Sequence, residues 1–396
     1  GSMFGDGNAY DRYSVRSNLD FQVTKITQIS VDLSLVKDKK KSHADNAFNI
    51  MTNLYRLGPR EPDVYSNGLP AFQESIGWSM NQLVHAGGES TYENDFQNLG
   101  MTVNQELPFL KGLSAKGYFN YDKQSYDGKS WRTPMISYKY DQTTNEYIED
   151  NGWLRSKPSL TQDHKTWSYY TAQGHLNYAN QFGKHGVSAL AVYERRWGNY
   201  KEIGAGRTEY DINIPELNMG SPNKANHSNS GTSNKYAQDG WVFRANYNYE
   251  QKYLLEVAGR YDRSYRYAPD KREAFFPSAS LGWRISEEKF IRDKFPSIDN
   301  LKLRLSYGKS GNPVGEEFAF MSKYLINNSY VWGKTPVQKQ GVYEGAEPNI
   351  NLTWETVWKA NVGFDLNMWK GLLGVEFDLY RDYRKDKILA PNAVVP

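Results

Sequence analysis

The chain is dominated by segments in which apolar and polar residues alternate one by one. The apolar residues of the first segment share one parity and are Tyr13, Val15, Leu19, Phe21 and Val23. Because the side chains of a β-strand point alternately to its two faces, a period of two predicts a strand with one apolar and one polar face. A second such segment, residues 29–35, follows after a short break. The pattern therefore predicts an all-β chain built from half-apolar strands.

These segments come in pairs that are joined by only a few residues. Four further pairs follow the first, and they cover residues 99–107 with 113–121, 170–178 with 187–193, 241–249 with 255–261, and 358–366 with 373–379. Two more alternating runs, 275–285 and 301–307, flank a connector in which Phe290 and Ile291 indicate a short helical turn. Alternation in total predicts about fourteen strands. Short connections between alternating runs predict antiparallel hairpins.

The connections between the hairpins are long. They cover residues 37–94, 122–166, 195–240 and 308–355, and they are rich in Asn, Gly, Ser and Pro. One short helix is expected in the first of them, where Ala47, Ile50, Met51 and Leu54 have helical spacing. Irregular loops of this length are uncommon in compact domains. Short turns that alternate with long loops, around strands of about ten residues, are typical of outer-membrane β-barrels.

Composition supports this class and excludes others. Aromatic residues make up 15% of the 396 residues, with 30 Tyr and 11 Trp, although the mean hydropathy is only −0.76. A disordered chain would have few aromatic residues, and a helical membrane bundle would need runs of roughly 18 apolar residues. The net charge of +3 argues against a nucleic-acid binder. The absence of Cys excludes disulfides and thiolate metal sites.

We therefore predict part of an antiparallel transmembrane β-barrel, with short periplasmic turns, long extracellular loops and the apolar parity facing lipid. Residues 1–3 have the composition of a cloning scar, and residues 4–396 are expected to form one domain. Two alternatives stay open, a soluble all-β carbohydrate-binding module and a non-transporting outer-membrane surface protein. No nucleophile–base pair is evident and the six His are scattered, so no enzyme, cofactor or metal site is predicted.

Several motifs of the chain resemble the SusC-like family of TonB-dependent outer-membrane transporters of Bacteroidetes. They follow one another as Arg16–Asp20, Tyr253–Asp262, Phe276–Glu288, Ile298–Gly308, Gly311–Asn312, Pro348–Thr356, Asn361–Asp365 and Tyr380–Asp382. The order of these motifs is specific to the family. Residues 122–240 resemble it in strand rhythm only.

The resemblance implies a barrel of about 22 strands around a plugged lumen, of which this chain would form a central part. The plug and the TonB-contacting segment would lie upstream of Gly1, and the last strands would lie beyond Pro396. It also implies an importer of oligosaccharides or peptides in the outer membrane of a Gram-negative bacterium. Its partners would be a SusD-like lid lipoprotein, TonB, the glycan or peptide substrate and outer-membrane lipid, but no nucleic acid.

Aromatic and arginine residues of the long segments are the candidate contacts for substrate or lid. They are Trp131, Trp153, Trp197 and Trp332, with Arg132, Arg155, Arg195 and Arg196. Tryptophan faces stack on sugar rings or peptide side chains, and arginine forks bind carboxylates or hydroxyls. The structural alternative is that Trp and Tyr near strand ends form interface girdles. Trp167 is a weaker candidate because it adjoins a strand.

Overall fold

A computed structural model of the chain describes residues 8–45, 47–150, 157–332 and 337–388, without the side chains of residues 327–340. Twelve strands form one antiparallel sheet, in which neighbours follow one another in the order of the chain and β1 and β16 are the two edges. They are β1 (Ala9–Thr24), β2 (Thr27–His43), β3 (Glu89–Glu106), β4 (Leu113–Arg132), β7 (Ser159–Phe182), β8 (His185–Thr208), β9 (His227–Tyr249), β10 (Tyr253–Ser264), β11 (Glu273–Arg284), β12 (Ile298–Asn312), β15 (Glu355–Met368) and β16 (Leu373–Lys385).

The remaining elements lie in the connections. They are α1 (Ala47–Arg56), α2 (Met80–His85), α3 (Lys289–Arg292) and the two hairpins β5 (Ser137–Asp141) with β6 (Glu146–Asp150) and β13 (Tyr324–Trp332) with β14 (Val337–Glu344). The all-β antiparallel fold is thus confirmed, and so are the two helical segments expected around Ile50 and Phe290. The sheet has twelve strands rather than about fourteen, and they are those of the five hairpin pairs and the two further alternating runs.

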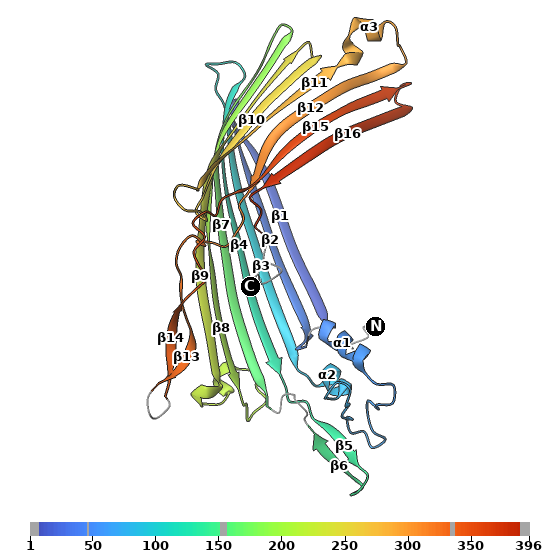
Figure 1. The fold of residues 1–396 in the computed structure, drawn as a ribbon, viewed down its shortest axis with the longest axis vertical. Helices are drawn as coiled ribbons and strands as arrows, with labels where there is room; N and C mark the ends of the chain where they lie inside the picture. The colour runs from blue at the N-terminus through green and yellow to red at the C-terminus, as the bar shows by residue number, and fades with distance from the viewer. Residues whose placement is uncertain (1–7, 46, 151–156, 333–336, 389–396) are drawn as a thin grey trace, which may run out of the picture.

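The sheet is an elongated, curved wall (Figure 1). Most of its short connections lie at one end, and several long connections lie at the other. One end, called the turn end, carries the connections between paired hairpin strands and α3; it consists of residues 25–26, 107–112, 183–184, 250–252, 285–297 and 369–372. The opposite end, called the loop end, carries residues 44–45, 47–88, 133–150, 157–158 and 209–226, with α1, α2 and the β5–β6 hairpin. At the turn end Gly112 has a φ of +87°, and a Cβ there would lie 2.0 Å from the carbonyl oxygen of Ala179. This close approach requires glycine.

The strands extend far into the segments that were expected to be irregular. β7 and β8 each have 24 residues, and β4 continues to Arg132. The expected strand length of about ten residues was therefore wrong for this part of the sheet. Alternation fades where both faces of a strand are polar, but the backbone ladder does not depend on side-chain polarity and continues.

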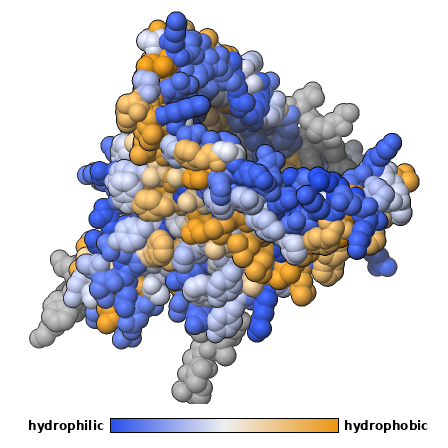
Figure 2. Space-filling view, turned by 90° about the horizontal axis from the view of Figure 1, so that it is seen from above, coloured by the Kyte–Doolittle hydropathy of each residue, from blue (hydrophilic) through white to orange (hydrophobic). Residues whose placement is uncertain are grey.

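The two faces of the sheet differ in polarity. The outer face is apolar and the inner face is hydrophilic, which is the reverse of the arrangement in a water-soluble protein. On β1 the apolar residues Val15, Phe21 and Val23 have exposed fractions of 62%, 51% and 58%. Figure 2, seen from above the turn end, shows hydrophobic residues along the outer side of the curved wall and hydrophilic residues along its inner side. We call these sides the convex face and the concave face. An apolar face turned outward requires a non-aqueous surrounding.

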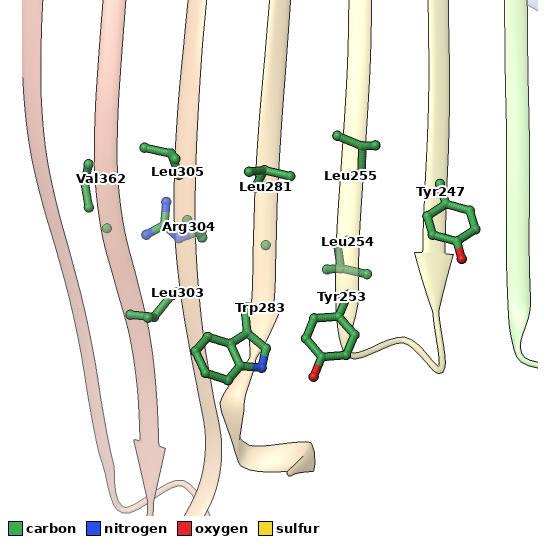
Figure 3. A pocket seen from close by; sticks show the side chains of 12 residues that line it. Tyr247, Tyr253, Leu254, Leu255, Leu281, Trp283, Leu303, Arg304, Leu305 and Val362 are labelled. Atoms are coloured by element: carbon green, nitrogen blue, oxygen red, sulfur yellow. The ribbon is translucent and has the colours of Figure 1, made fainter.

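Apolar residues form continuous rows across the convex face because the strand registers align them. One row runs through Tyr247, Leu255, Leu281, Leu305, Val362 and Leu379 on six successive strands. Figure 3 shows five of these side chains around a shallow hollow of about 810 Å³, with Tyr253 and Trp283 toward the turn end. Such uninterrupted rows are the surface that lipid chains would cover.

Aromatic side chains border this apolar band at both ends. Toward the turn end, the Tyr253 ring lies 6.4 Å from both Tyr249 and Trp283. Toward the loop end, Tyr170 stacks on Tyr121 at 5.0 Å and on Trp197 at 5.4 Å. Two aromatic bands on either side of an apolar one are the girdles of a membrane barrel.

Other architectures do not fit the described part of the chain. The two other sheets among these residues have two strands each, so a sandwich of two large sheets is not found there. No helix within the described ranges is long and apolar enough to cross a membrane.

The lipid-facing parity can be tested on two adjacent residues of β12. Leu305→Arg places a guanidinium on the convex face and is expected to lower the free energy of unfolding by about 2–4 kcal/mol. Ser306→Arg, the matched control, points to the concave face and should cost less than about 1 kcal/mol. The measurement is denaturant unfolding of the protein in lipid vesicles. Equal losses for both variants would show that the assignment of the faces is wrong.

Candidate functional site

The concave face carries aromatic side chains in its half toward the loop end. The ring centroids of Trp167 and Tyr200 lie 5.1 Å apart, and those of Tyr169 and Tyr236 lie 5.4 Å apart. A third pair, Tyr92 and Tyr126, is stacked at 6.0 Å. All of these residues have the parity opposite to the convex rows, because they alternate with residues such as Tyr170. They form a set of ring surfaces on which sugar rings or apolar peptide side chains could stack.

Charged side chains of the same face form ion pairs with one another. Glu194 is only 5% exposed, and its carboxylate accepts hydrogen bonds from Arg196 at 3.0 Å and from Arg260 at 3.2 Å. Arg260 also donates to both carboxylate oxygens of Asp262, at 2.8 and 2.7 Å. The four side chains therefore form one compensated ion-pair cluster at the centre of the sheet. Compensation leaves the face hydrophilic without a strong field of one sign.

A second ion pair is combined with the aromatic surfaces. Lys165 lies 2.8 Å from Glu202, which also accepts a hydrogen bond from the hydroxyl of Tyr200. The ammonium group of Lys165 is 5.8 Å from the ring centroid of Tyr126. Ring faces are thus mixed with donors and acceptors of both signs, which is the chemistry needed to contact an amphipathic, polar solute weakly at many points.

A hollow of about 370 Å³ lies at the loop end of this face. It is lined by Lys40 and Ser42 of β2, Tyr92 of β3, Arg132 of β4, and by Ala44, Asp45, Ala47, Asn49 and Ile50. Arg132 is exposed there. Among the predicted arginines, Arg132 and Arg196 are therefore the two that the structure places on the concave face.

The loop that borders this hollow has its own small core. Ile50 of α1, Met80 and Leu83 of α2, Ile76 and Met135 are buried together. The fully buried Gln73 connects the loop internally, since its amide donates to the carbonyl of Pro62 at 3.1 Å and accepts from the N–H of Met80 at 2.8 Å. The loop is thus a folded unit with its own hydrophobic core and internal hydrogen bonds.

One carboxylate outside the strands stabilises that loop. Glu61 accepts hydrogen bonds from the N–H of Ser75 at 2.8 Å, from the Ser75 hydroxyl and from the N–H of Gly58 at 3.3 Å. Partial burial raises the pKa of Glu61, but these hydrogen bonds outweigh it, so the pKa lies below its ordinary value.

Three of the other predicted residues lie on or toward the convex face. Trp131 is 7% exposed and packs edge to face on Tyr210 at 4.8 Å, beside Leu160. Trp197 belongs to the outer aromatic band, and the guanidinium of Arg195 lies 5.7 Å from its ring. The expectation that these residues lie in loops was wrong, because β4 and β8 continue through them. Trp153 and Arg155 lie outside the described residues, as does the side chain of Trp332.

Trp167, a weaker candidate by sequence, lies on the concave face. Its position next to a strand counted against it, although a strand residue of the polar parity faces the concave side. The signal that could have found it is that parity, since Trp167 and Tyr169 alternate with the outward Tyr170 and Ala172.

Metal and nucleotide sites receive no support where the chain is described. No group of three or more His, Asp or Glu residues that could hold a metal ion occurs in those ranges. Gly204–Gly206, whose two glycines could suggest a nucleotide-binding loop, lies within strand β8.

Comparison with known proteins agrees with this geometry. The family model described as "TonB dependent receptor-like, beta-barrel" matches residues 38–396. The chain belongs to this family. Its convex face is accordingly the lipid face of an outer-membrane barrel wall, its turn end is periplasmic and its loop end is extracellular.

Relatives within the TonB-dependent receptor family support the SusC-like resemblance. TonB-dependent receptor P39 of Formosa agariphila is 30% identical over 94% of this chain and 34% of its own length. TonB-dependent receptor P3 of the same organism is 23% identical over 93% of the chain and 36% of its length. SusC of Bacteroides thetaiotaomicron is 34% identical over 39% of the chain and 15% of its length. The chain spans about a third of the length of the relatives that it matches most fully.

Solved structures share the fold of this TonB-dependent receptor chain. The RagAB peptide transporter superposes with a TM-score of 0.77 at 18% identity, over 98% of this chain and 42% of that one. The ferric-catecholate import receptor Fiu of E. coli reaches a TM-score of 0.50 at 11% identity, over 98% and 53% of the two chains. At these identities the similarity shows the fold alone.

The concave ion-pair cluster predicts a specific loss of stability. Glu194→Ala leaves two guanidinium groups without their shared carboxylate, so we expect a decrease of about 1–3 kcal/mol in the free energy of unfolding. Glu256→Ala is the control, because Glu256 makes only a loose pair with the exposed Arg244 at 3.7 Å and should cost about 0.5 kcal/mol or less. The measurement is urea unfolding in detergent. A Glu194 variant as stable as the control would contradict the cluster's role.

The lowered pKa of Glu61 predicts that the stability of its loop depends on pH. A carboxyl whose pKa is lowered by folding stabilises the fold above its unfolded pKa, and that stabilisation is lost as the pH falls through the folded value. Hydrogen-exchange protection of residues 57–79, corrected for intrinsic rates, should therefore decrease below about pH 4. Glu61→Gln should remove most of this dependence, and the distant exposed Glu347→Gln should not. Protection that is independent of pH in the unmodified protein would refute the prediction.

Proposed function

We propose that this chain forms part of the wall of an outer-membrane, TonB-dependent importer of SusC type. The observation that carries the proposal is the pairing of a lipid-compatible convex face with a concave face that bears aromatic rings and compensated charges. Such a wall suits a water-filled lumen through which a polar solute moves. The similarity to SusC and to the RagAB peptide transporter supports the same class.

The proposed substrate is an oligosaccharide or a peptide. Trp167, Tyr200, Tyr169 and Tyr236 would offer stacking surfaces, and Arg132 and Arg196 would offer forked donors on the same face. Both substrate classes present ring or side-chain faces together with hydroxyls or carboxylates. Trp153, Arg155 and Trp332 stay predicted contacts, whereas Trp131, Trp197 and Arg195 are left out of the proposed route because they do not face it.

The proposed partners are a SusD-like lid lipoprotein at the loop end and TonB, which would act through another part of the receptor. The packed loop around α1 and α2 gives the loop end a defined surface that a lid could contact. The proposal needs no covalent chemistry and no cofactor, because energy for release would come from TonB. A surface protein that does not transport is the second possibility, and it would share the wall but not the TonB dependence.

Binding and transport are tested separately with one pair of variants. Titration of the detergent-purified receptor with a neutral oligosaccharide mixture and with a tryptic peptide mixture should identify the class that binds. Trp167→Ala should weaken that binding about tenfold, since a ring contact of about 1.4 kcal/mol is lost. Trp197→Ala is the matched control on the convex face and should change it less than twofold. A stronger effect of Trp197→Ala would contradict the proposed route.

Uptake by cells then distinguishes an importer from a passive surface protein. Cells that carry the receptor should accumulate the bound class, and removal of TonB should abolish this accumulation while binding stays. Uptake that persists without TonB, or binding without any uptake, would refute the importer proposal.

A further inference from the structure

A row of charged residues lies on the convex face within the outer aromatic band, since Arg195 lies between Tyr193 and Trp197 on β8. Arg195 of β8 pairs in register with Asp239 of β9, which in turn pairs with Arg263 of β10. The adjacent convex row, one step toward the turn end, consists of Tyr193, Trp241 and Tyr261. Each charged residue is therefore two positions beyond an aromatic one, about 7 Å farther along its strand.

This position corresponds to the phosphate level of the membrane. Trp and Tyr of a barrel girdle lie at the headgroup level of the bilayer. Trp241 is 45% exposed and its ring lies 5.0 Å from that of Tyr193, as expected for girdle residues. Arg195, which lies between the girdle residues Tyr193 and Trp197, therefore meets the polar headgroups of the outer leaflet.

The row opens onto a pocket of about 270 Å³ that is rich in arginine. Arg195, Arg263 and Arg272 line it together with Asp239 and Tyr265. Arg263 engages Asp239 with two hydrogen bonds of 3.0 and 2.8 Å, so the charge of that carboxylate is already compensated. Arg272 donates from Nε to the carbonyl oxygen of Tyr267 at 3.0 Å, and no carboxylate pairs with it or with Arg195 among the described residues.

The surroundings increase the positive charge. Lys201 and Lys235 are exposed on the same face, farther toward the loop end, and neither has an ion pair in the described part of the chain. Glu273, in register with Arg263, is the one further carboxylate that adjoins the row there. Cations therefore outnumber carboxylates on this part of β8, β9 and β10, and an anion would be attracted to it.

The convex face of β2 and β3 shows that this excess is local. There Lys37 and Lys39 lie 3.0 and 2.8 Å from Glu93, and Lys41 lies 2.6 Å from Glu89. The lysines of that sector are neutralised within the protein, whereas Arg195 is not. The convex face thus differs in charge between the two sectors.

We propose that the pocket of Arg195, Arg263 and Arg272 binds the phosphate group of a phosphorylated glycolipid headgroup in the outer leaflet. The guanidinium fork of arginine matches phosphate in two parallel hydrogen bonds. The apolar rows below the girdle would hold the acyl chains of the same lipid, so headgroup and chains are bound on one continuous surface. The site does not depend on the transport proposed above.

The test uses the full receptor in detergent, freed of lipid, with lipid A as the probe and its dephosphorylated form as the comparison. Arg195→Gln should weaken lipid A binding about tenfold, and Arg195→Lys, which keeps the charge but not the fork, should lie between the two. Lys39→Gln is the matched control on the same face and should change binding less than twofold. Heat-modifiable migration on gels verifies that each variant is folded.

Three outcomes would overturn the proposal. Arg195→Gln could bind lipid A as tightly as the unmodified receptor. The dephosphorylated lipid could bind as tightly as lipid A, which would mean that only the apolar surface is used. Inorganic phosphate alone could bind the receptor as tightly as lipid A does, in which case the pocket is a site for free phosphate rather than for a lipid.

Discussion

The structure depends on one constraint, which is that every backbone polar group inside a bilayer must find a hydrogen-bond partner within the protein. An antiparallel sheet in which every strand between β1 and β16 pairs with two neighbours meets this constraint along the wall between those two edge strands. The ladder also sets the register, and the register places Leu255, Leu281 and Leu305 side by side on the convex face. Apolar rows, aromatic bands and the polar concave face all follow from that pairing.

The concave face meets a different requirement. Its charged side chains must be paired with opposite charges, while the face as a whole stays hydrophilic. Arg304 shows how, since its guanidinium contacts Asp365 at 2.8 Å, Asp378 at 3.1 Å and Glu376 at 3.2 Å across two neighbouring strands. Arg304 and Asp365 belong to motifs shared with the SusC-like family. Trp354, in another of these motifs, is buried against Tyr267 and anchors a loop by donating to the carbonyl of Arg272. These motifs therefore correspond to contacts that hold strands and loops in place.

Prediction from the sequence succeeded where the membrane imposes a pattern and failed where it does not. The twelve strands were located because lipid on one side and water on the other enforce alternation. The ends of β4, β7, β8 and β9 were missed because both of their faces are polar outside the bilayer, while the backbone pairing continues. For that reason Trp131 and Trp197 were assigned to loops, and Trp167 was undervalued although its parity turns it to the concave face.

By itself the sequence determined the all-β class, the hairpin pairs, the lipid-facing parity and the SusC-like family, because each of these is written in local alternation or in contiguous motifs. Only the tertiary structure decided which aromatic and charged residues meet. The cluster of Glu194, Arg196 and Arg260 and the row of Arg195, Asp239 and Arg263 join residues from different strands. The physical reason is that a contact across strands depends on register and curvature, which the hydrogen-bond ladder of the whole sheet sets and no single segment encodes.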